Sequence, residues 1–240
     1  MFQTIKSFTI FSAVYLLIVL FGQEEIAWYL KPFLLLLLLI TVFTTQKFQS
    51  KNTLLLALAF SWLGDILLMF VSKNGSFFIF GLIAFLLSHL TYIVLFTQQP
   101  KSSEQLALSL EPINKGSSML MAQSSKLLRF GAGFIILYLC IMLKVLLPHL
   151  GATRLPVTVY ALVISTMLFF AFKGSLNWKK PAGNYVLLGA LFFVMSDSIL
   201  AFNKFYSPIP YNSFLIMSTY CIAQGLIVTG ILKLNGTAPN

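Results

Sequence analysis

The sequence predicts an all-α polytopic membrane protein, because its composition and its apolar pattern fit a bilayer rather than water. Of its 240 residues, 58% are hydrophobic and 9% are charged, whereas a soluble domain carries about 25% charged residues. The mean hydropathy is +0.90. The apolar residues form long blocks, and a helix needs about 20 of them to cross the hydrocarbon core. The strict alternation of an outer-membrane barrel is absent from the sequence, so helices are expected to satisfy the backbone.

Eight blocks of the sequence are predicted to be transmembrane helices. They cover residues 7–22, 28–45, 52–71, 77–97, 129–147, 154–172, 184–202 and 211–232. The first block resembles a signal peptide, but no clean cleavage site follows it and seven more blocks do, so we expect a retained helix. The polar segment 98–128 is expected to be a cytoplasmic linker, in which LALSL or MLMAQSSKLL can form a short interfacial helix. We expect the whole chain, residues 1–240, to form a single membrane domain.

The positive charges predict the orientation of these helices. Eleven of the 16 Lys and Arg residues fall on the side that holds both termini, four fall on the other side, and Lys144 lies within a block. The positive-inside rule therefore places both termini in the cytoplasm. The net charge of +10 fits this bias and an attraction to anionic membrane lipid. Nucleic acid is not an expected partner, and short loops without a retention signal favour a bacterial inner membrane.

The two halves of the chain contain similar segments, which indicates a parallel repeat of four helices plus four. FSWLGDILLMF at 60–70 and FFVMSDSILAF at 192–202 align Asp65 with Asp197, and each segment lies in the third block of its half. In proteins built from such repeats the site lies between the halves. The match is short, so a chance similarity is the alternative.

Asp65 and Asp197 are the two acidic residues, among six, that lie within the predicted helices. Each is about 13 residues into its helix, which at about 1.5 Å per residue is roughly 20 Å deep. An aspartate near the bilayer centre costs roughly 2.5–3.5 kcal/mol. Two such residues at one depth predict a functional pair that faces a shared cavity. The alternative is that both hold helices together.

Other polar side chains are expected to join this layer or to line the path to it. The candidate binding residues are Ser61, His89, Tyr92, Tyr160, Ser196, Tyr220 and Gln224. Each has the alternative role of a hydrogen-bond partner between helices. Lys73 and Lys204 follow the two aspartate helices and are candidates to hold a phosphate head group, with ordinary loop charge as the alternative. No metal and no cofactor is predicted, because the spacing contains no motif such as HExxH.

Several of these segments, taken in order, resemble one known family. FSWLGDILLMF, SHLTY, PVTVYALVISTM, LFFVMSDSILAF and TYCIAQ are similar to segments of the YhhN-like lysoplasmalogenase family, from the second predicted helix to the eighth. The resemblance implies an eight-helix membrane enzyme that hydrolyses the vinyl ether bond of lysoplasmalogens, which are lysophospholipids. It implies that Asp65 and Asp197 are catalytic. It also implies that the site is lined by His89, Tyr92, Tyr160, Tyr220 and Gln224. The segment 98–128 is longer than is usual in this family.

Vinyl ether hydrolysis requires a protonated acid and a nearby anion, much as glycosidases use a pair of carboxyl groups. The sequence leaves open which aspartate holds the proton. It also leaves open two other classes of protein. One is a transporter in which the aspartates bind a proton or a cation, although no predicted helix is broken in its middle by Gly or Pro. The other is a lipid hydrolase with a metal held by Asp65, Asp197 and His89.

Overall fold

The protein is a bundle of long helices, described by a computed structural model for residues 2–102 and 115–236. No strand occurs among these described residues. The long helices are α1 (Phe2–Leu20), α2 (Glu24–Thr44), α3 (Lys51–Met69), α4 (Ser76–Thr97), α6 (Lys115–Leu146), α7 (Arg154–Ser175), α8 (Ala182–Phe205) and α9 (Asn212–Leu234). Two short 3₁₀ helices, Leu147–His149 and Gly151–Thr153, join α6 to α7.

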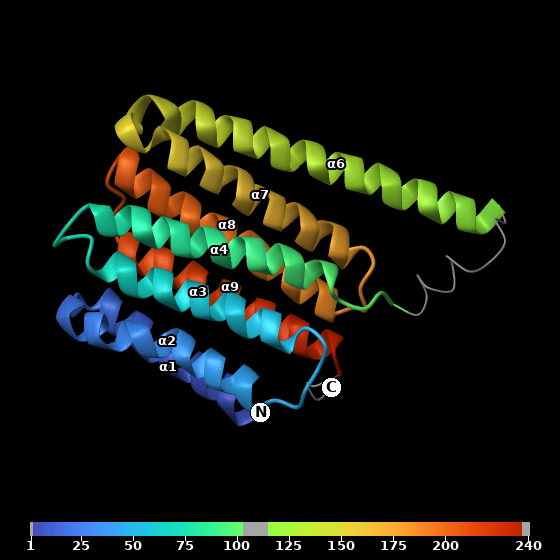
Figure 1. The fold of residues 1–240 in the computed structure, drawn as a ribbon, viewed down its shortest axis with the longest axis horizontal. Helices are drawn as coiled ribbons and strands as arrows, with labels where there is room; N and C mark the ends of the chain where they lie inside the picture. The colour runs from blue at the N-terminus through green and yellow to red at the C-terminus, as the bar shows by residue number, and fades with distance from the viewer. Residues whose placement is uncertain (1, 103–114, 237–240) are drawn as a thin grey trace.

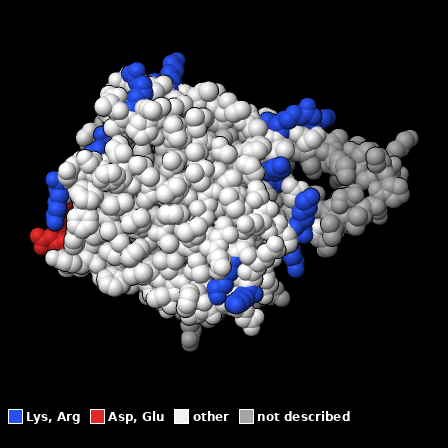
Figure 2. All heavy atoms as spheres, viewed as in Figure 1, with Lys and Arg blue, Asp and Glu red and all other residues white. Residues whose placement is uncertain are grey.

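Seven of these helices, α2 to α9, are long and apolar enough to cross a membrane, so the chain is an integral membrane protein. The apolar part of α1 that can be assessed, Ile5–Leu20, is shorter than a full span. Seven of the eight predicted spans are therefore confirmed, and the first stays a prediction. Figure 2 shows the charged side chains gathered at the two ends of the bundle, with a broad band free of charge between them on this face.

The helix ends carry charges that suit the helix dipole. Glu24 and Glu25 lie in the first turn of α2, where the partial positive charge of the dipole stabilises carboxylates. Lys173, Lys204 and Lys233 lie in the last turns of α7, α8 and α9, where the partial charge is negative. These residues help to fix where the apolar helices begin and end.

Helices that are neighbours in the sequence pack against each other, and other contacts join the two halves of the chain. α3 packs on α4 and α8 on α9, while α4 packs on α7 and α1 on α9. The contact of α8 with α9 is close because it uses glycine. A Cβ atom on Gly189 would lie 2.8 Å from the Ala223 carbonyl oxygen, and one on Gly230 would lie 2.9 Å from the Ala182 carbonyl oxygen. Small residues of this kind let membrane helices approach closely.

Helix α6 lies at one edge of the bundle, opposite α1 and α2 (Figure 1). Only 6% of its apolar span is buried, compared with 61% for α9. It begins at Lys115, well before the start predicted at residue 129, so the second part of the expected linker is helical. Residues 115–128 contain no proline. Their Met, Leu, Ala, Gln and Lys residues favour helix, although the segment has too many polar residues to form an apolar span. The segment LALSL lies outside the described residues.

Candidate active site

Asp197 lies on α8 at the wall of a cavity within the membrane-spanning part of the bundle. The cavity has a volume of about 70 Å³, which is room for a few water molecules. Its walls come from α3, α4, α6, α7 and α8 and are mainly apolar. The carboxyl side chain is 15% exposed, so it can contact a molecule that enters. Tyr138, Ser165 and Ser198 add hydroxyl groups to the same wall.

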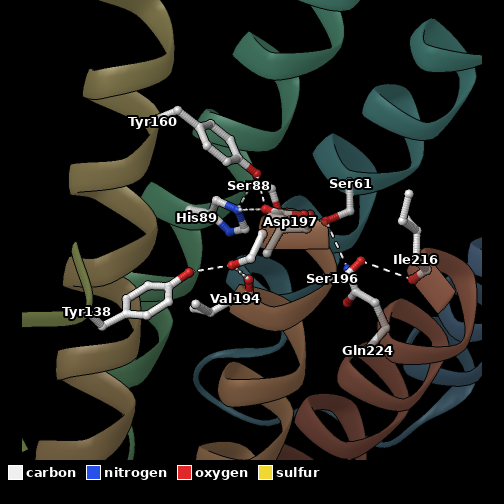
Figure 3. A network of polar contacts seen from close by, with 12 residues as sticks. Ser61, Ser88, His89, Tyr138, Tyr160, Val194, Ser196, Asp197, Ile216 and Gln224 are labelled. Carbon is white, nitrogen blue, oxygen red and sulfur yellow. Dashed lines mark hydrogen bonds and ion pairs between the residues drawn. The ribbon is translucent and has the colours of Figure 1, made fainter. Parts of the chain in front are cut away.

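Two aromatic side chains hold the Asp197 carboxyl in place, and both come from other helices. The Tyr160 hydroxyl on α7 donates a hydrogen bond to Asp197 Oδ2. His89 Nε2 on α4 lies 3.4 Å from the same oxygen and 2.8 Å from the Tyr160 hydroxyl. Figure 3 shows Tyr160 and His89 directed toward Asp197. The structure therefore brings together three of the residues predicted from sequence, and His89 is fully buried behind the carboxyl.

Asp65 lies on α3 in a more enclosed setting. It is 4% exposed and accepts a hydrogen bond of 2.7 Å from the Tyr220 hydroxyl on α9. It is not among the residues that line the cavity beside Asp197. The ring of Phe193 packs against the partners of both carboxyls, at 4.7 Å from His89 and 5.5 Å from Tyr220 between ring centroids. One aromatic ring thus connects the two aspartate sites.

A third set of predicted residues forms a hydrogen-bond chain between α3, α4 and α9. The Tyr92 hydroxyl donates to Gln224 Oε1 at 2.6 Å, and Gln224 Nε2 donates to Ser61 Oγ at 3.1 Å. Ser61 then contacts Ser88 at 2.7 Å, and Ser88 donates to the Ala57 carbonyl at 2.8 Å. The four side chains are fully buried and do not line the cavity. Their contacts in this structure connect helices.

We expect the change Gln224→Leu to lower stability more than activity. The change leaves the buried Tyr92 hydroxyl without its acceptor, which costs about 1–2 kcal/mol. Thermal unfolding in detergent should move to lower temperature, while the activity of each folded molecule is retained. The double variant with Tyr92→Phe should cost less than the sum of the two single changes, because the two groups share one interaction. Loss of activity without loss of stability would contradict this expectation.

The remaining predicted residues lie apart from the carboxyl groups. Ser196 is buried and donates to the Ile216 carbonyl at 3.0 Å, so it faces α9. Lys73 and Lys204 are exposed. The Lys204 ammonium lies 5.5 Å from the centre of the Phe78 ring, which lines the cavity. The Lys73 ammonium lies over Phe70, which does not line it. Of the two lysines, Lys204 is the one that lies beside a ring of the cavity wall.

Two polar residues at the cavity, Tyr138 and Ser165, were not among the candidates. Tyr138 on α6 forms a hydrogen bond with Ser198, the residue after Asp197. The Ser165 hydroxyl on α7 is buried and has no hydrogen-bond partner among the described residues. A signal for Ser165 was present, because the cavity-lining residues of α7 follow a helical stripe: Val157, Tyr160, Ala161, Ile164 and Ser165. No comparable signal marked Tyr138.

The described side chains contain no group of three or more His, Cys, Asp or Glu residues placed to hold a metal ion. His89 and Asp197 are in contact, but Asp65 bonds to Tyr220 instead. The metal site that was considered from Asp65, Asp197 and His89 is therefore not assembled in this arrangement.

Fold and site together define an α-helical integral membrane protein. Two of its carboxyl groups lie between the helices, and each accepts a hydrogen bond from a tyrosine of another helix. The chain belongs to the YhhN family, whose family model matches residues 26–231. It is 33% identical over 190 residues to human "Lysoplasmalogenase TMEM86A", an alignment that covers 77% of this chain and 67% of the relative. It is 31% identical over 179 residues to human "Lysoplasmalogenase TMEM86B", covering 74% of this chain and 62% of that relative. No solved structure matches the chain.

Proposed function

We propose that this protein hydrolyses the vinyl ether bond of lysoplasmalogens, to a fatty aldehyde and glycerophosphoethanolamine or glycerophosphocholine. One observation carries the proposal beyond family membership. The carboxyl group of Asp197 is partly exposed at the wall of an apolar cavity and is held by Tyr160 and His89. A carboxyl group at an apolar wall is suited to protonate an apolar double bond.

The reaction requires a proton at carbon and then water. Protonation of the β-carbon of the vinyl ether creates an oxocarbenium cation, as in glycoside hydrolysis. Water adds to the α-carbon of this cation and loses a proton, which gives a hemiacetal. The hemiacetal collapses to the aldehyde and the alcohol of the glycerol backbone. A single carboxyl group can give the first proton and accept the second, so the acid is regenerated in each cycle.

In this proposal Asp197 is the proton donor, because it is the aspartate that lines the cavity. Tyr160 and His89 orient its carboxyl group through Oδ2, which leaves Oδ1 for the substrate. Asp65 is the second catalytic carboxylate, an anion whose charge stabilises the cation from beyond the Phe193 ring. Charge of this kind acts strongly where water is excluded. Lys204, which lies beside Phe78 of the cavity wall, is the proposed partner of the phosphate head group.

We also propose that both termini lie in the cytoplasm of a bacterial cell. We further propose that the two halves of the chain are a parallel repeat. Asp65 and Asp197 are 132 positions apart, and their partners His89 and Tyr220 are 131 apart. Each of these partners lies on the fourth helix of the half opposite its aspartate. Reciprocal contacts of this kind are expected when two related halves face each other.

The test of the proposed function is aldehyde release by the protein purified in detergent. Lysoplasmenylcholine and lysoplasmenylethanolamine are the substrates, and we expect a fatty aldehyde and the matching glycerophosphodiester in equal amounts. An ester-linked lysophosphatidylcholine is the matched control and should yield no aldehyde. If neither plasmalogen is cleaved, the proposal fails. Uptake into proteoliposomes driven by a pH gradient would then support the transporter class instead.

A further inference from the structure

An apolar groove runs along the outer face of the bundle between α6, α7 and α8. It has a volume of about 720 Å³. Its lining residues on α6 lie between Leu127 and Tyr138, and those on α8 lie between Leu187 and Ser198. Tyr138 and Ser198 supply the only polar side chains in this lining, and both are at the same end of the groove. The rest of the groove is suited to an alkyl chain.

The groove and the cavity of Asp197 meet at one place. Three residues, Tyr138, Val194 and Ser198, line both spaces. The Tyr138 hydroxyl bonds to Ser198, and Ser198 donates to the Val194 carbonyl. Figure 3 shows the Tyr138 side chain reaching from α6 toward α8 at this point. The Tyr138 ring therefore stands at the passage between the groove and the carboxyl.

On each of α6, α7 and α8, the residues that line the cavity and those that line the groove follow each other along the helix in the same spatial order. On α6 the cavity residues follow Tyr138 and the groove residues precede it, and on α7 the cavity residues end at Ser165 before the groove begins at Leu168. On α8 the order runs from Lys204, which lies over Phe78 of the cavity wall, through Asp197, to the groove as far as Leu187. This is the order of the parts of a single-chain vinyl ether lipid: phosphate, vinyl ether, alkenyl chain.

The groove is open toward the lipid-facing side of the protein. Phe130 and Phe134 on α6 are 78% and 67% exposed, and Leu191 on α8 is 44% exposed. α6 is held close to α7, since a Cβ atom on Gly131 would collide with the Phe172 ring at 2.2 Å. The opening therefore lies between α6 and α8. The alkyl chain of a lipid that enters here passes from the membrane to an apolar wall, so its entry exposes no apolar surface to water.

We propose that this groove binds the alkenyl chain of the substrate, and that Tyr138 is a specificity-determining residue at the point where the chain enters the reaction cavity. This inference rests on the proposed function for the identity of the chain. Bulk membrane lipid that fills the groove at random is the competing occupant.

A photo-crosslinking experiment tests the groove without any need for turnover. The probe is a 1-O-alkyl lysophosphocholine, which lacks the vinyl group, with a diazirine at the end of its chain. The comparison probe is a diacyl phosphatidylcholine with the same diazirine. We expect the ether probe to label peptides within 127–138 and 187–198, and the diacyl probe to label the lipid-facing surface broadly. Identical labelling patterns for the two probes would overturn the proposal, whether or not the protein releases aldehyde.

Substitutions then test selectivity in the aldehyde-release assay. Leu191→Trp fills the groove, and we expect KM for a long-chain lysoplasmalogen to rise roughly tenfold, the order expected when a side chain takes volume that an apolar group needs. KM for a short-chain analogue should stay unchanged. The matched control is Leu162→Trp on α7, a residue that is 48% exposed and does not line the groove. Equal effects of the two tryptophans would overturn the proposal.

Tyr138 is tested by two changes. Tyr138→Phe keeps the ring but loses the hydrogen bond to Ser198, and Tyr138→Ala joins the groove to the cavity. We expect Tyr138→Ala to lower kcat and to remove the preference between long and short chains, while Tyr138→Phe keeps that preference. A uniform loss of activity in both variants at every chain length would show a merely structural role and overturn the assignment.

Discussion

Asp197→Asn is expected to reduce aldehyde release by roughly 10³-fold, in the range that general acid catalysis contributes. The amide has the shape of the carboxyl group, and its oxygen can still accept the hydrogen bond of Tyr160. It has no acidic proton to give to the β-carbon. The variant should therefore fold and bind lipid normally while kcat falls. The measurement is kcat for lysoplasmenylcholine, together with crosslinking by the non-hydrolysable ether probe.

The matched control for this change is Tyr160→Phe. It keeps the carboxyl group and removes one of the two groups that orient it. We expect a fall of only about tenfold in kcat, because one hydrogen bond to the neutral carboxyl group of the proton donor is worth about 0.5–1.5 kcal/mol. An Asp197→Asn variant that is more active than Tyr160→Phe would show that Asp197 is not the donor.

Asp65→Asn is expected to reduce kcat by roughly 10²-fold, as when one preorganised electrostatic group is removed. The amide oxygen can still accept from the Tyr220 hydroxyl, so the contact between α3 and α9 is preserved. What is lost is the negative charge that stabilises the oxocarbenium cation. The measurement is again kcat, with thermal unfolding in detergent to confirm that stability is unchanged.

Tyr220→Phe distinguishes the role of the Asp65 negative charge from the role of its hydrogen bond to α9. It removes the hydrogen bond but leaves the carboxylate. If Asp65 acts by its charge, Asp65→Asn loses activity and keeps stability, whereas Tyr220→Phe loses stability and keeps most of its activity. The opposite pattern would mean that Asp65 serves to hold α3 and α9 together, which is the structural alternative for an aspartate inside a membrane helix.

The fold was largely predictable because membrane helices are specified by long apolar blocks. The predicted ends of the seven confirmed spans fall within a few residues of the helix ends, apart from the start of α6 at Lys115. There the composition was misleading, since residues 115–128 are too polar to form a span but still favour helix. The length of an apolar block predicts how much of a helix lies in the bilayer, but the helix itself can continue into polar residues outside it.

The sequence identified most residues of the candidate site, but it did not show which of them contact each other. Asp197, Tyr160 and His89 come together as three predicted residues from three helices. Tyr92 and Gln224 were equally plausible from sequence, yet they bond to each other. A buried polar residue produces the same sequence pattern whether it faces a cavity or another helix.

The rotation of each helix about its own axis was the missing information. Ser196 and Ser198 flank Asp197 symmetrically in sequence, but at about 100° per residue they face very different directions. Close packing of α8 on α9 at Gly189 turns Ser196 toward α9 and leaves Ser198 at the cavity. Tyr138 carried no signal, because single tyrosines are common in membrane helices, above all near the membrane–water interface.

The position of Asp197 between Lys204 and the apolar groove also bears on how the products of the proposed reaction would separate. In the proposed reaction, cleavage at this point divides the substrate into a water-soluble glycerophosphodiester on the Lys204 side and a long-chain aldehyde on the Leu187 side. The two products then have different exits, one to the aqueous phase and one into the lipid. Because neither product has to pass the other, release of the polar product does not wait for the aldehyde to leave. In this proposal the aldehyde is released directly into the bilayer.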